Sequence, residues 1–493
     1  MRMLRHSISR KSRKRSNALD FHKKLEHSFK MQIDTTGLLE PQFKHVQKLV
    51  DSLYLNGHAV DMSETGTGKT YAAAAVIREM NRPFAVICPK SVIHQWEKIL
   101  TSFKLKAVTV IGYEKICRGN TKWLKWKKLP DPTHPYQENA TRELPHFKFD
   151  TNTLVVVDEG HKCKGTDTSN SWMLVALKLQ GYKVLVSSAT VATSPLEMKA
   201  FGFMTNLHAL YNFRDFCRVH GAELLPQYGA MTFNLASTAA REAMLSLNEY
   251  LFETTKCASR MRVEDFGKEF PESHIVAEAY DLGSNESKIQ AVYDEMDYEL
   301  AKLEEKSENY SEHIFAVMMK ARRKAELCKV PLFVDMIEDL YDEGKSVVLF
   351  VNFADTVSAV VNRLNKVKKF KDSVGYIVGG QTDKQRVDDI NAFQADQKRI
   401  LIVNIAAGGT GVSLHDLNGK YPRASLISPN WSAYNMRQAL GRVWRLEGKT
   451  KSYQRIVYAA KCIEENICHR VQHKLNCLDT LNDGDLAESL TLV

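Results

Sequence analysis

One stretch decides the fold class: Ser63-Glu64-Thr65-Gly66-Thr67-Gly68-Lys69-Thr70, which opens the alanine-rich run 71–80. Closely spaced glycines let backbone N–H groups wrap a chain of phosphates, and the start of the following helix adds a favourable dipole. In this pattern the lysine reaches the β- and γ-phosphates and the last hydroxyl binds Mg²⁺. The pattern normally begins with glycine, and Ser63 is a tolerated small residue there. A turn that merely opens a helix is the weaker interpretation, so we expect a nucleotide site that includes Thr65, Gly66, Thr67, Gly68, Lys69 and Thr70.

An acidic pair follows an apolar run farther along the chain. Residues 154–157 are Leu-Val-Val-Val, and Asp158 and Glu159 come directly after them. An ATPase needs two such carboxylates, one to hold Mg²⁺ and one to orient and deprotonate the attacking water. We assign these roles to Asp158 and Glu159 respectively. An acidic pair alone is a weak signal, but together with the phosphate loop it indicates an ATPase.

Short β-branched runs alternate with helical stretches from Gly37 onward, which is typical of parallel sheets covered by helices. Two sets of expected strands are separated by a mostly helical region without comparable runs. The first set is 84–88, 154–157 and 184–187, and the second is 347–351, 376–378, 400–403 and 425–427. We therefore expect an α/β protein with two lobes and a helical insertion between them.

This pattern divides the chain into five parts. We expect a basic disordered arm, a first lobe that binds ATP, a helical protrusion or linker region, a second lobe and a loose tail. Their bounds are 1–20, 21–206, 207–343, 344–478 and 479–493.

The composition is that of a globular protein, with 44% hydrophobic residues, and the charge is uneven. The net charge of +10 includes seven basic residues and no acid within 1–19. Such an arm can bind nucleic acid or carry a localisation signal, and a solvated, disordered end is the equal alternative. No apolar run approaches the 20 or so residues of a membrane span, and no secretory signal follows the basic start. The nine cysteines lack paired spacing, so we expect an intracellular protein of the cytoplasm, the nucleus or a virus-infected cell.

The order of motifs resembles the superfamily-two helicase-like ATPases, most closely their Swi/Snf-type branch. The resemblance spans about 37–475. The blocks that carry it in the first half are Leu39-Glu40-Pro41-Gln42, the phosphate loop, Pro89-Lys90-Ser91-Val92-Ile93-His94-Gln95-Trp96, Gly112-Tyr113-Glu114, Asp158-Glu159-Gly160-His161-Lys162-Cys163-Lys164-Gly165 and Ser188-Ala189-Thr190. Those in the second half are the Gly-rich block 406–414, Asn430-Trp431-Ser432, Gln438-Ala439-Leu440-Gly441-Arg442-Val443-Trp444-Arg445 and Ile463-Glu464-Glu465-Asn466-Ile467.

The resemblance implies two RecA-like lobes and a role for further residues. Gln42 would read adenine, and Gly408 and Gly411 would belong to the nucleotide site. Arg442 and Arg445 would act as arginine fingers, and Gln438 would position the water or the γ-phosphate. The block at 89–96 would grip one nucleic-acid strand, and 112–114 resembles the next short block of the family. ATP and Mg²⁺ are the implied cofactors.

The leading functional hypothesis is an ATP-driven translocase on double-stranded DNA that remodels DNA or bound protein. A strand-separating helicase on RNA or DNA is the second hypothesis, and Ser188-Ala189-Thr190 favours it slightly. A genome-packaging motor is less favoured, because the second half carries a Gly-rich block and an arginine motif instead of a nuclease. The compact size is compatible with a virus or phage. The sequence does not predict a protein cargo or an oligomeric state.

Three smaller basic groups have both a nucleic-acid interpretation and a structural one. Residues 117–150 are basic and aromatic, a composition that can stack on bases or pack as a surface insertion. A second group is Arg260 with Arg262, and a third is Lys320, Arg322, Arg323 and Lys324. Each of these two could face a nucleic acid or form a solvated face balanced by Glu.

Overall fold

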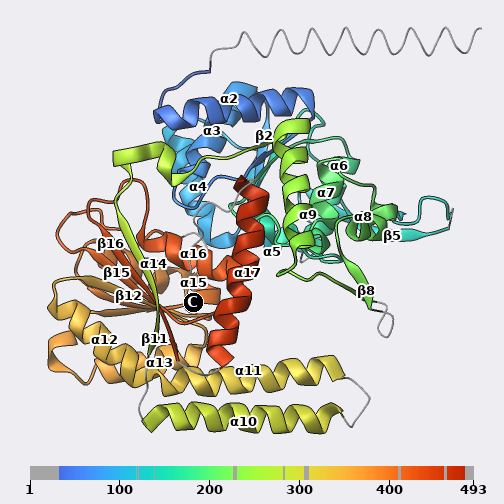
Figure 1. Cartoon of the computed structure of the whole chain (residues 1–493). Coiled ribbons are helices and arrows are strands. Elements are labelled where there is room, and N and C mark those ends of the chain that lie inside the picture. Colours follow the sequence, from blue (N-terminus) through green and yellow to red (C-terminus); the bar gives the residue numbers. More distant parts are fainter. Residues whose placement is uncertain are drawn as a thin grey trace, which may run out of the picture. The chain divides into compact units, whose positions relative to one another are not determined.

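The computed structural model describes residues 33–483 except 118, 120, 138, 226–229, 281–283, 305–309, 409–411 and 460–462. The basic arm predicted at 1–20 lies outside the described residues, as does Gly411. The chain forms two compact units (Figure 1). The first unit consists of the residues up to Glu64, Gly68–Asp265 and Cys477–Leu486. The second unit consists mainly of Phe266–Asn476 and also includes Thr65–Thr67.

The first unit contains a six-stranded parallel sheet in the order β10-β1-β7-β6-β2-β3. Its central strands are apolar on both faces because helices cover both sides, as expected for parallel sheets. The strands are β1 (His58–Asp61), β2 (Phe84–Cys88), β3 (Thr109–Gly112), β6 (Leu154–Asp158), β7 (Lys183–Ser187) and β10 (Ala258–Ser259).

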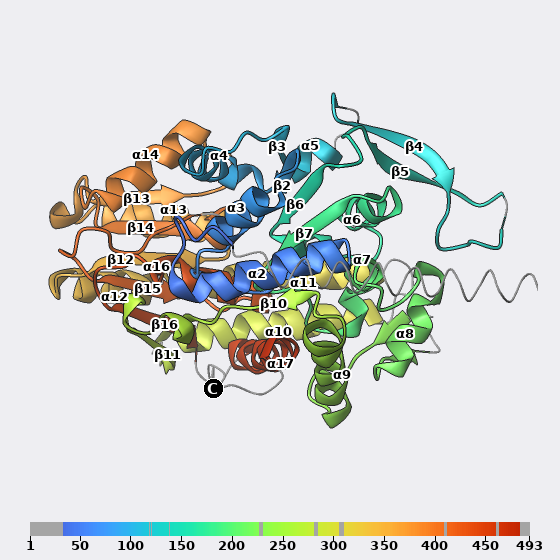
Figure 2. The ribbon, with the colours of Figure 1, turned by 90° about the horizontal axis from the view of Figure 1, so that it is seen from above.

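The helices of the first unit are α2 (Glu40–Leu55), α3 (Lys69–Met80), α4 (Ile93–Ser102), α5 (Tyr113–Cys117), α6 (Ser169–Leu179), α7 (Lys199–Met204), α8 (Phe213–Val219) and α9 (Thr238–Glu249). Two antiparallel hairpins complete the unit: β4 (Leu124–Pro130) with β5 (Thr141–Phe147), and β8 (Glu223–Leu225) with β9 (Ala230–Thr232). Figure 2 shows β4 and β5 extending away from the sheet of this unit.

The second unit has its own six-stranded parallel sheet, in the order β11-β16-β15-β12-β14-β13. Its strands are β11 (Ser273–Tyr280), β12 (Ser346–Val351), β13 (Val374–Ile377), β14 (Ile400–Asn404), β15 (Arg423–Ile427) and β16 (Ser452–Ala459). Its helices are α10 (Ser284–Glu304), α11 (Tyr310–Cys328), α12 (Val330–Asp342), α13 (Ala354–Leu364), α14 (Asp383–Gln394), α15 (Ile405–Gly408), α16 (Ala433–Val443) and most of α17 (Ile463–Asp483). The predicted pair of parallel α/β lobes is confirmed.

The region predicted as mostly helical contains strands as well. β10 and β11 are the two edge strands at its centre, one in each sheet. β11 was missed because an edge strand alternates apolar and polar residues instead of forming an apolar run; its Val276 is 45% exposed.

The polar end of the chain also differs from expectation. We expected a loose tail from Asp479, but α17 continues to Asp483. Asp479 and Asn482 are 7% and 2% exposed. The polarity of this segment was misleading because its polar groups have partners inside the protein: Asn482 Nδ2 donates to Ala189 O at 3.2 Å.

A buried ion pair holds the second unit together. Lys329 is completely buried, and its Nζ lies 2.7 and 2.9 Å from the two carboxylate oxygens of Glu464. Lys329 also donates to Ser428 Oγ at 3.1 Å. Removing one partner of such a pair leaves a buried charge without compensation.

We expect Glu464→Ala to lower the free energy of unfolding by about 3–5 kcal/mol, measured by urea denaturation. Glu338→Ala is the matched control, because its pair with Lys369 is exposed and should contribute little to stability. Equal losses in the two variants would contradict this account of the buried pair.

Candidate functional site

The phosphate loop begins at the carboxyl end of β1 and leads into α3. Gly66 and Gly68 have φ angles of +94° and +85°, which L side chains rarely adopt. A Cβ on Gly68 would also lie 2.6 Å from Gln42 Nε2. Lys69 folds back over the loop, and its Nζ donates to Ser63 O at 3.0 Å and to Glu64 O at 2.9 Å. The ammonium group therefore rests on carbonyl oxygens that phosphate oxygens can replace.

Ser63, which stands where the phosphate-loop pattern normally has glycine, forms a side-chain hydrogen bond that glycine could not form. Its N–H donates to Asp61 Oδ1 at 2.9 Å, and its Oγ accepts from Met261 N at 2.9 Å. His45 Nε2 lies 3.2 Å from Asp61 Oδ1. Burial would raise the pKa of Asp61, but His45, Lys69 and Ser63 outweigh it and hold that pKa below its usual value. A negative charge is thus fixed beneath the start of the loop.

A cationic side chain holds the other side of the loop. Arg260 donates to Met62 O at 2.7 Å and to Glu64 Oε1 at 3.1 Å. Asp483, from the last turn of α17, accepts from Arg260 Nε at 2.7 Å and from Arg260 Nη2 at 2.9 Å. Arg262 Nε also donates to Asp483, at 2.9 Å. Arg260 is thus buried within the first unit, while Arg262, 41% exposed, pairs with the same carboxylate from the surface.

The two predicted catalytic carboxylates lie at the carboxyl end of β6. Asp158 Oδ2 accepts from Trp96 Nε1 at 2.8 Å, and Asp158 Oδ1 accepts from the N–H of Glu159 at 2.9 Å. Burial, followed by the charge of Glu159, raises the pKa of Asp158 to about 7, while Trp96 and the Lys69 ammonium act in the opposite direction. The site therefore brings Lys69 and Asp158 within electrostatic reach, as the sequence predicted.

Glu159 is connected to the Ser-Ala-Thr motif through a histidine. Glu159 adopts a left-handed conformation (φ +54°), and its Oε2 lies 3.3 Å from His161 Nδ1. His161 Nδ1 lies 3.5 Å from Ser188 Oγ, and burial lowers the pKa of His161. Gly160 is required between them, since a Cβ there would lie 2.3 Å from Val186 Cγ1. The Nδ1 atom of one buried ring thus lies between Glu159 and Ser188.

Gln42 occupies the first turn of α2 and is 3% exposed. Its Oε1 accepts from Leu39 N at 2.9 Å, which fixes the amide, and its Nε2 faces Gly68. The amide that we predicted to read adenine is thus already held beside the phosphate loop. Its role in adenine recognition stays a prediction.

Two aromatic residues of the blocks at 89–96 and 112–114 are buried and contact Asp158. Trp96 is 1% exposed and holds Asp158, as described above. Tyr113 is 2% exposed, and its hydroxyl donates to Asp158 O at 2.7 Å. No signal in the sequence indicated these contacts. The side chains of the first block that remain exposed are those of Lys90, Ser91 and His94.

The arginine motif lies on and just after α16 in the second unit. Arg442 is 2% exposed, donates to Val412 O at 3.2 Å and contacts Gln438, which is 3% exposed. Arg445 is partly exposed and donates to Gly441 O at 3.2 Å. The finger roles of Arg442 and Arg445 and the role of Gln438 stay predictions, and exposure favours Arg445 among them. Gly408 ends α15.

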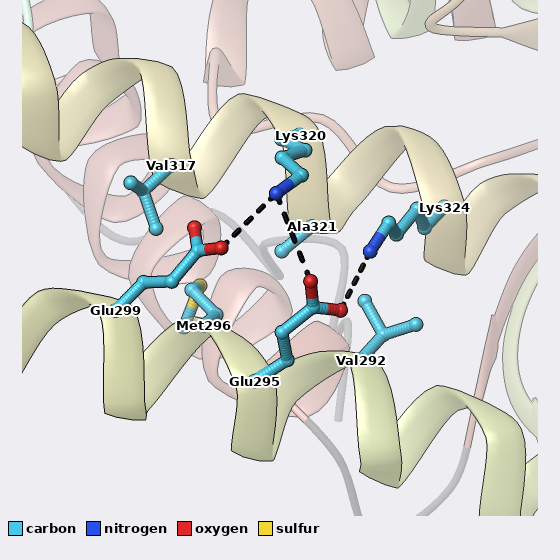
Figure 3. Close-up of a pocket in the computed structure, with 8 residues that line it drawn as sticks. All are labelled: Val292, Glu295, Met296, Glu299, Val317, Lys320, Ala321 and Lys324. Carbon is cyan, nitrogen blue, oxygen red and sulfur yellow. Dashed lines mark hydrogen bonds and ion pairs between the residues drawn. The ribbon is translucent and has the colours of Figure 1, made fainter.

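The basic group on α11 is neutralised within the helical hairpin of the second unit. Figure 3 shows a pocket between α10 and α11 where Lys320 Nζ lies 3.0 Å from Glu299 and Lys324 Nζ lies 2.6 Å from Glu295. Arg323 pairs with Asp355, and the Arg322 guanidinium lies 5.7 Å from the ring centroid of Trp431. The interpretation as a helix face balanced by acids fits this group best.

The chain matches two protein families and is similar to several known proteins. The family described as "Type III restriction enzyme, res subunit" matches residues 35–193, and "Helicase conserved C-terminal domain" matches residues 328–447. The "Putative ATP-dependent RNA helicase L364" of Acanthamoeba polyphaga mimivirus is 32% identical over 470 residues, which cover 92% of this chain and 85% of that protein. This chain belongs to the superfamily-two helicase-like ATPases.

The predicted family is thereby confirmed, as is the assignment as a helicase-type, nucleic-acid-dependent ATPase. A "DNA repair and recombination protein RAD54-like" of Drosophila grimshawi is 22% identical over 86% of this chain, and the chain spans 60% of that relative's length. A solved Sulfolobus solfataricus SWI2/SNF2 ATPase core in complex with dsDNA is 16% identical, with coverage of 92% and 94% of the two chains. Its TM-score of 0.35 is too low to support an inference.

The residues present fit a Mg²⁺-bound nucleotide. Gly66 and Gly68 adopt positive φ angles that L side chains rarely adopt, so the loop can turn tightly around a phosphate chain. The Lys69 ammonium lies beside the same loop. Thr70 and Asp158 would supply oxygen ligands, the type that Mg²⁺ prefers. When bound, the ion would neutralise charge on the phosphates. Within the described residues, no helix is both long and apolar enough to cross a membrane.

We expect Trp96→Phe to make ATP turnover more sensitive to acid. The change removes the N–H donor that lowers the pKa of Asp158, so that pKa should rise and the ionised form should be lost at a higher pH. The ratio of variant to wild-type turnover should fall steadily from pH 8 to pH 6. Trp172→Phe is the control, because Trp172 Nε1 donates to Asp167 instead of the acidic pair. A pH-independent ratio for Trp96→Phe would contradict this role.

Proposed function

We propose that this protein is an ATP-dependent translocase on double-stranded DNA. The observation that carries the ATPase part is the meeting of the phosphate loop, Lys69 and the Asp158–Glu159 pair at the carboxyl edge of one parallel sheet. The proposal of duplex DNA as the track is supported by the Swi/Snf-like acidic box at 158–165 and by the RAD54-like relatives.

Binding begins with an exchange of partners at the loop. The Lys69 ammonium leaves the carbonyl oxygens of Ser63 and Glu64 and takes up the β- and γ-phosphate oxygens. The backbone N–H groups around Gly66 and Gly68 surround the phosphates, and the start of α3 favours their negative charge. Because Asp61 and Arg260 hold the first residues of the loop, little further ordering is needed when the nucleotide arrives.

Hydrolysis then depends on the second carboxylate. Glu159 orients a water molecule towards the γ-phosphate and accepts its proton. Loss of the γ-phosphate changes the charge that Glu159 faces, and His161 can carry that change to Ser188. Arg445 is the proposed arginine finger, a contribution worth about 10³–10⁵ in rate in related NTPases. Repeated opening and closing of the site would move the protein along its track.

A strand-separating helicase is the second candidate. It is supported by the name of the mimivirus relative, a putative ATP-dependent RNA helicase, and by Ser188-Ala189-Thr190. The two candidates differ in the nucleic acid that should activate ATP turnover.

The test is the ATPase rate without nucleic acid and with duplex DNA, single-stranded DNA or RNA. We expect duplex DNA to increase the rate at least about tenfold, and Glu159→Gln and Lys69→Ala to reduce it by at least about 100-fold because they remove the base and the phosphate ligand. Glu197→Gln is a control, since Glu197 pairs with Lys164 outside the nucleotide site. Activation by single strands or RNA alone would overturn the duplex proposal in favour of the helicase.

A further inference from the structure

The hairpin of β4 and β5 lies within the first basic group noted in the sequence. Most cations of the other two groups pair with acids, whereas the lysines of the hairpin pair with none of the described acids. Lys122, Lys125, Lys127, Lys128 and Lys148 are all exposed. None of these five lysines forms an ion pair with another described residue, whereas the arginine of the same hairpin, Arg142, pairs with Asp131 at 3.0 Å and Asp167 at 2.9 Å.

The tryptophans of the hairpin pack against the protein core and are therefore not available to stack on bases. Trp123, Trp126 and Leu129 pack against the core of the first unit. Trp126 Nε1 donates to Ile116 O at 3.2 Å, and Lys148 N donates to Trp123 O at 2.9 Å. The hairpin is therefore fastened by its aromatic side, and its lysines are presented from a fixed backbone.

Further contacts fix the second strand. Gln180 Oε1 accepts from Phe147 N at 2.9 Å, and Gln180 Nε2 donates to Pro145 O at 3.0 Å. The Tyr182 hydroxyl donates to Phe149 O at 2.9 Å. Lysines on such a scaffold lose little backbone freedom when they bind a partner.

The register concentrates the positive charge. Lys125 lies opposite His146, and Lys127 and Lys128 lie opposite Leu144 and Glu143. Burial, followed by the charges of Lys127 and Lys148, lowers the pKa of His146, as expected for a ring in a positive field. Glu143 is the one acid on the paired strands β4 and β5, so positive charge prevails there.

The hairpin lies close in sequence to two blocks at one edge of the sheet: the block at 89–96, which resembles a nucleic-acid contact, and the next short block of the family. β2 and β3 are neighbouring parallel strands, and the blocks at 89–96 and 112–114 follow their carboxyl ends. β4 begins a few residues after the second of these blocks, beyond α5. The hairpin thus extends from the edge of the sheet where these two blocks lie (Figure 2).

We infer that the exposed lysines of the β4–β5 hairpin form an accessory binding surface for the phosphate backbone of nucleic acid. Lys125 and Lys127, which share one face of β4, and Lys128 on the other face are its central contacts. The inference rests on the proposed function, because it assigns a second contact to the nucleic acid on which the ATPase acts. Exposed lysines bind phosphates without reading sequence and release condensed counterions as they do so. The surface therefore adds affinity without adding sequence preference.

The test is the salt dependence of binding, measured with the full chain and a fluorescent duplex DNA of mixed sequence over a series of KCl concentrations. Each phosphate contact on duplex DNA contributes about 0.9 to the slope of log K against log salt. The variant Lys125→Gln/Lys127→Gln/Lys128→Gln should therefore lose about 1 to 3 units of slope, bind about tenfold more weakly at low salt and keep its ATPase rate without nucleic acid.

The control is Lys44→Gln/Lys48→Gln/Lys106→Gln, which removes the same charge from exposed lysines of the same unit outside the hairpin. It should keep the wild-type slope. An equal loss in both variants would mean that net charge alone matters, and an unchanged slope in the hairpin variant would mean that the hairpin does not touch the nucleic acid. Either result overturns the inference.

Glu143→Gln provides an independent test of opposite sign. This change removes the negative charge beside Lys128, so binding should tighten about twofold and remain salt dependent. Unchanged or weaker binding would contradict the inference even where the lysine variant fails to fold. Wild-type protein that bound no nucleic acid at all would instead overturn the proposed function, so the two failures are distinguishable.

Discussion

The site depends on one electrostatic arrangement: the Lys69 ammonium lies within electrostatic reach of two buried carboxylates, Asp61 and Asp158. A buried carboxylate is costly unless it is paired, hydrogen-bonded or protonated. Hydrogen bonds from Trp96 and from the N–H of Glu159 offset part of the cost of burying Asp158. The part that is not offset raises the pKa of Asp158 to about 7. The site is therefore prepared for a cation, because a bound cation would offset the cost of ionising Asp158.

Polar side chains around the phosphate loop hold it in place. His45 and Asp61 lie beneath the start of the loop, while Arg260 holds Met62 and Glu64 from another side and is itself held by Asp483. The side chains of Asp61, Arg260 and Asp483 are at most 5% exposed. Arg260 and Asp483 form an ion pair, and Asp61 accepts a hydrogen bond from the Ser63 N–H. The loop is thus fixed by polar contacts that a glycine-rich sequence could not provide by itself.

Residues that act through their own local pattern could be predicted from the sequence. Lys69, Asp158 and Glu159 belong to short motifs at the ends of apolar strands, and the central strands are apolar throughout. Contacts that join distant parts of the chain could not be predicted in this way. Trp96 and Asp158 are 62 residues apart, and Arg260 and Asp483 are 223 residues apart. The edge strand β11 and the end of α17 were missed for a related reason, since polar residues there are satisfied by partners that the sequence does not reveal.

The most direct test of this electrostatic account is the number of protons released when the Mg²⁺-bound nucleotide binds, measured by titration calorimetry in buffers of different ionisation enthalpy. A carboxyl with a pKa of about 7 that must ionise on binding should release about 0.8 proton at pH 6.5 and about 0.1 at pH 8. Binding without proton release at pH 6.5 would contradict the claim that the surroundings of Asp158 raise its pKa to about 7 before the nucleotide arrives.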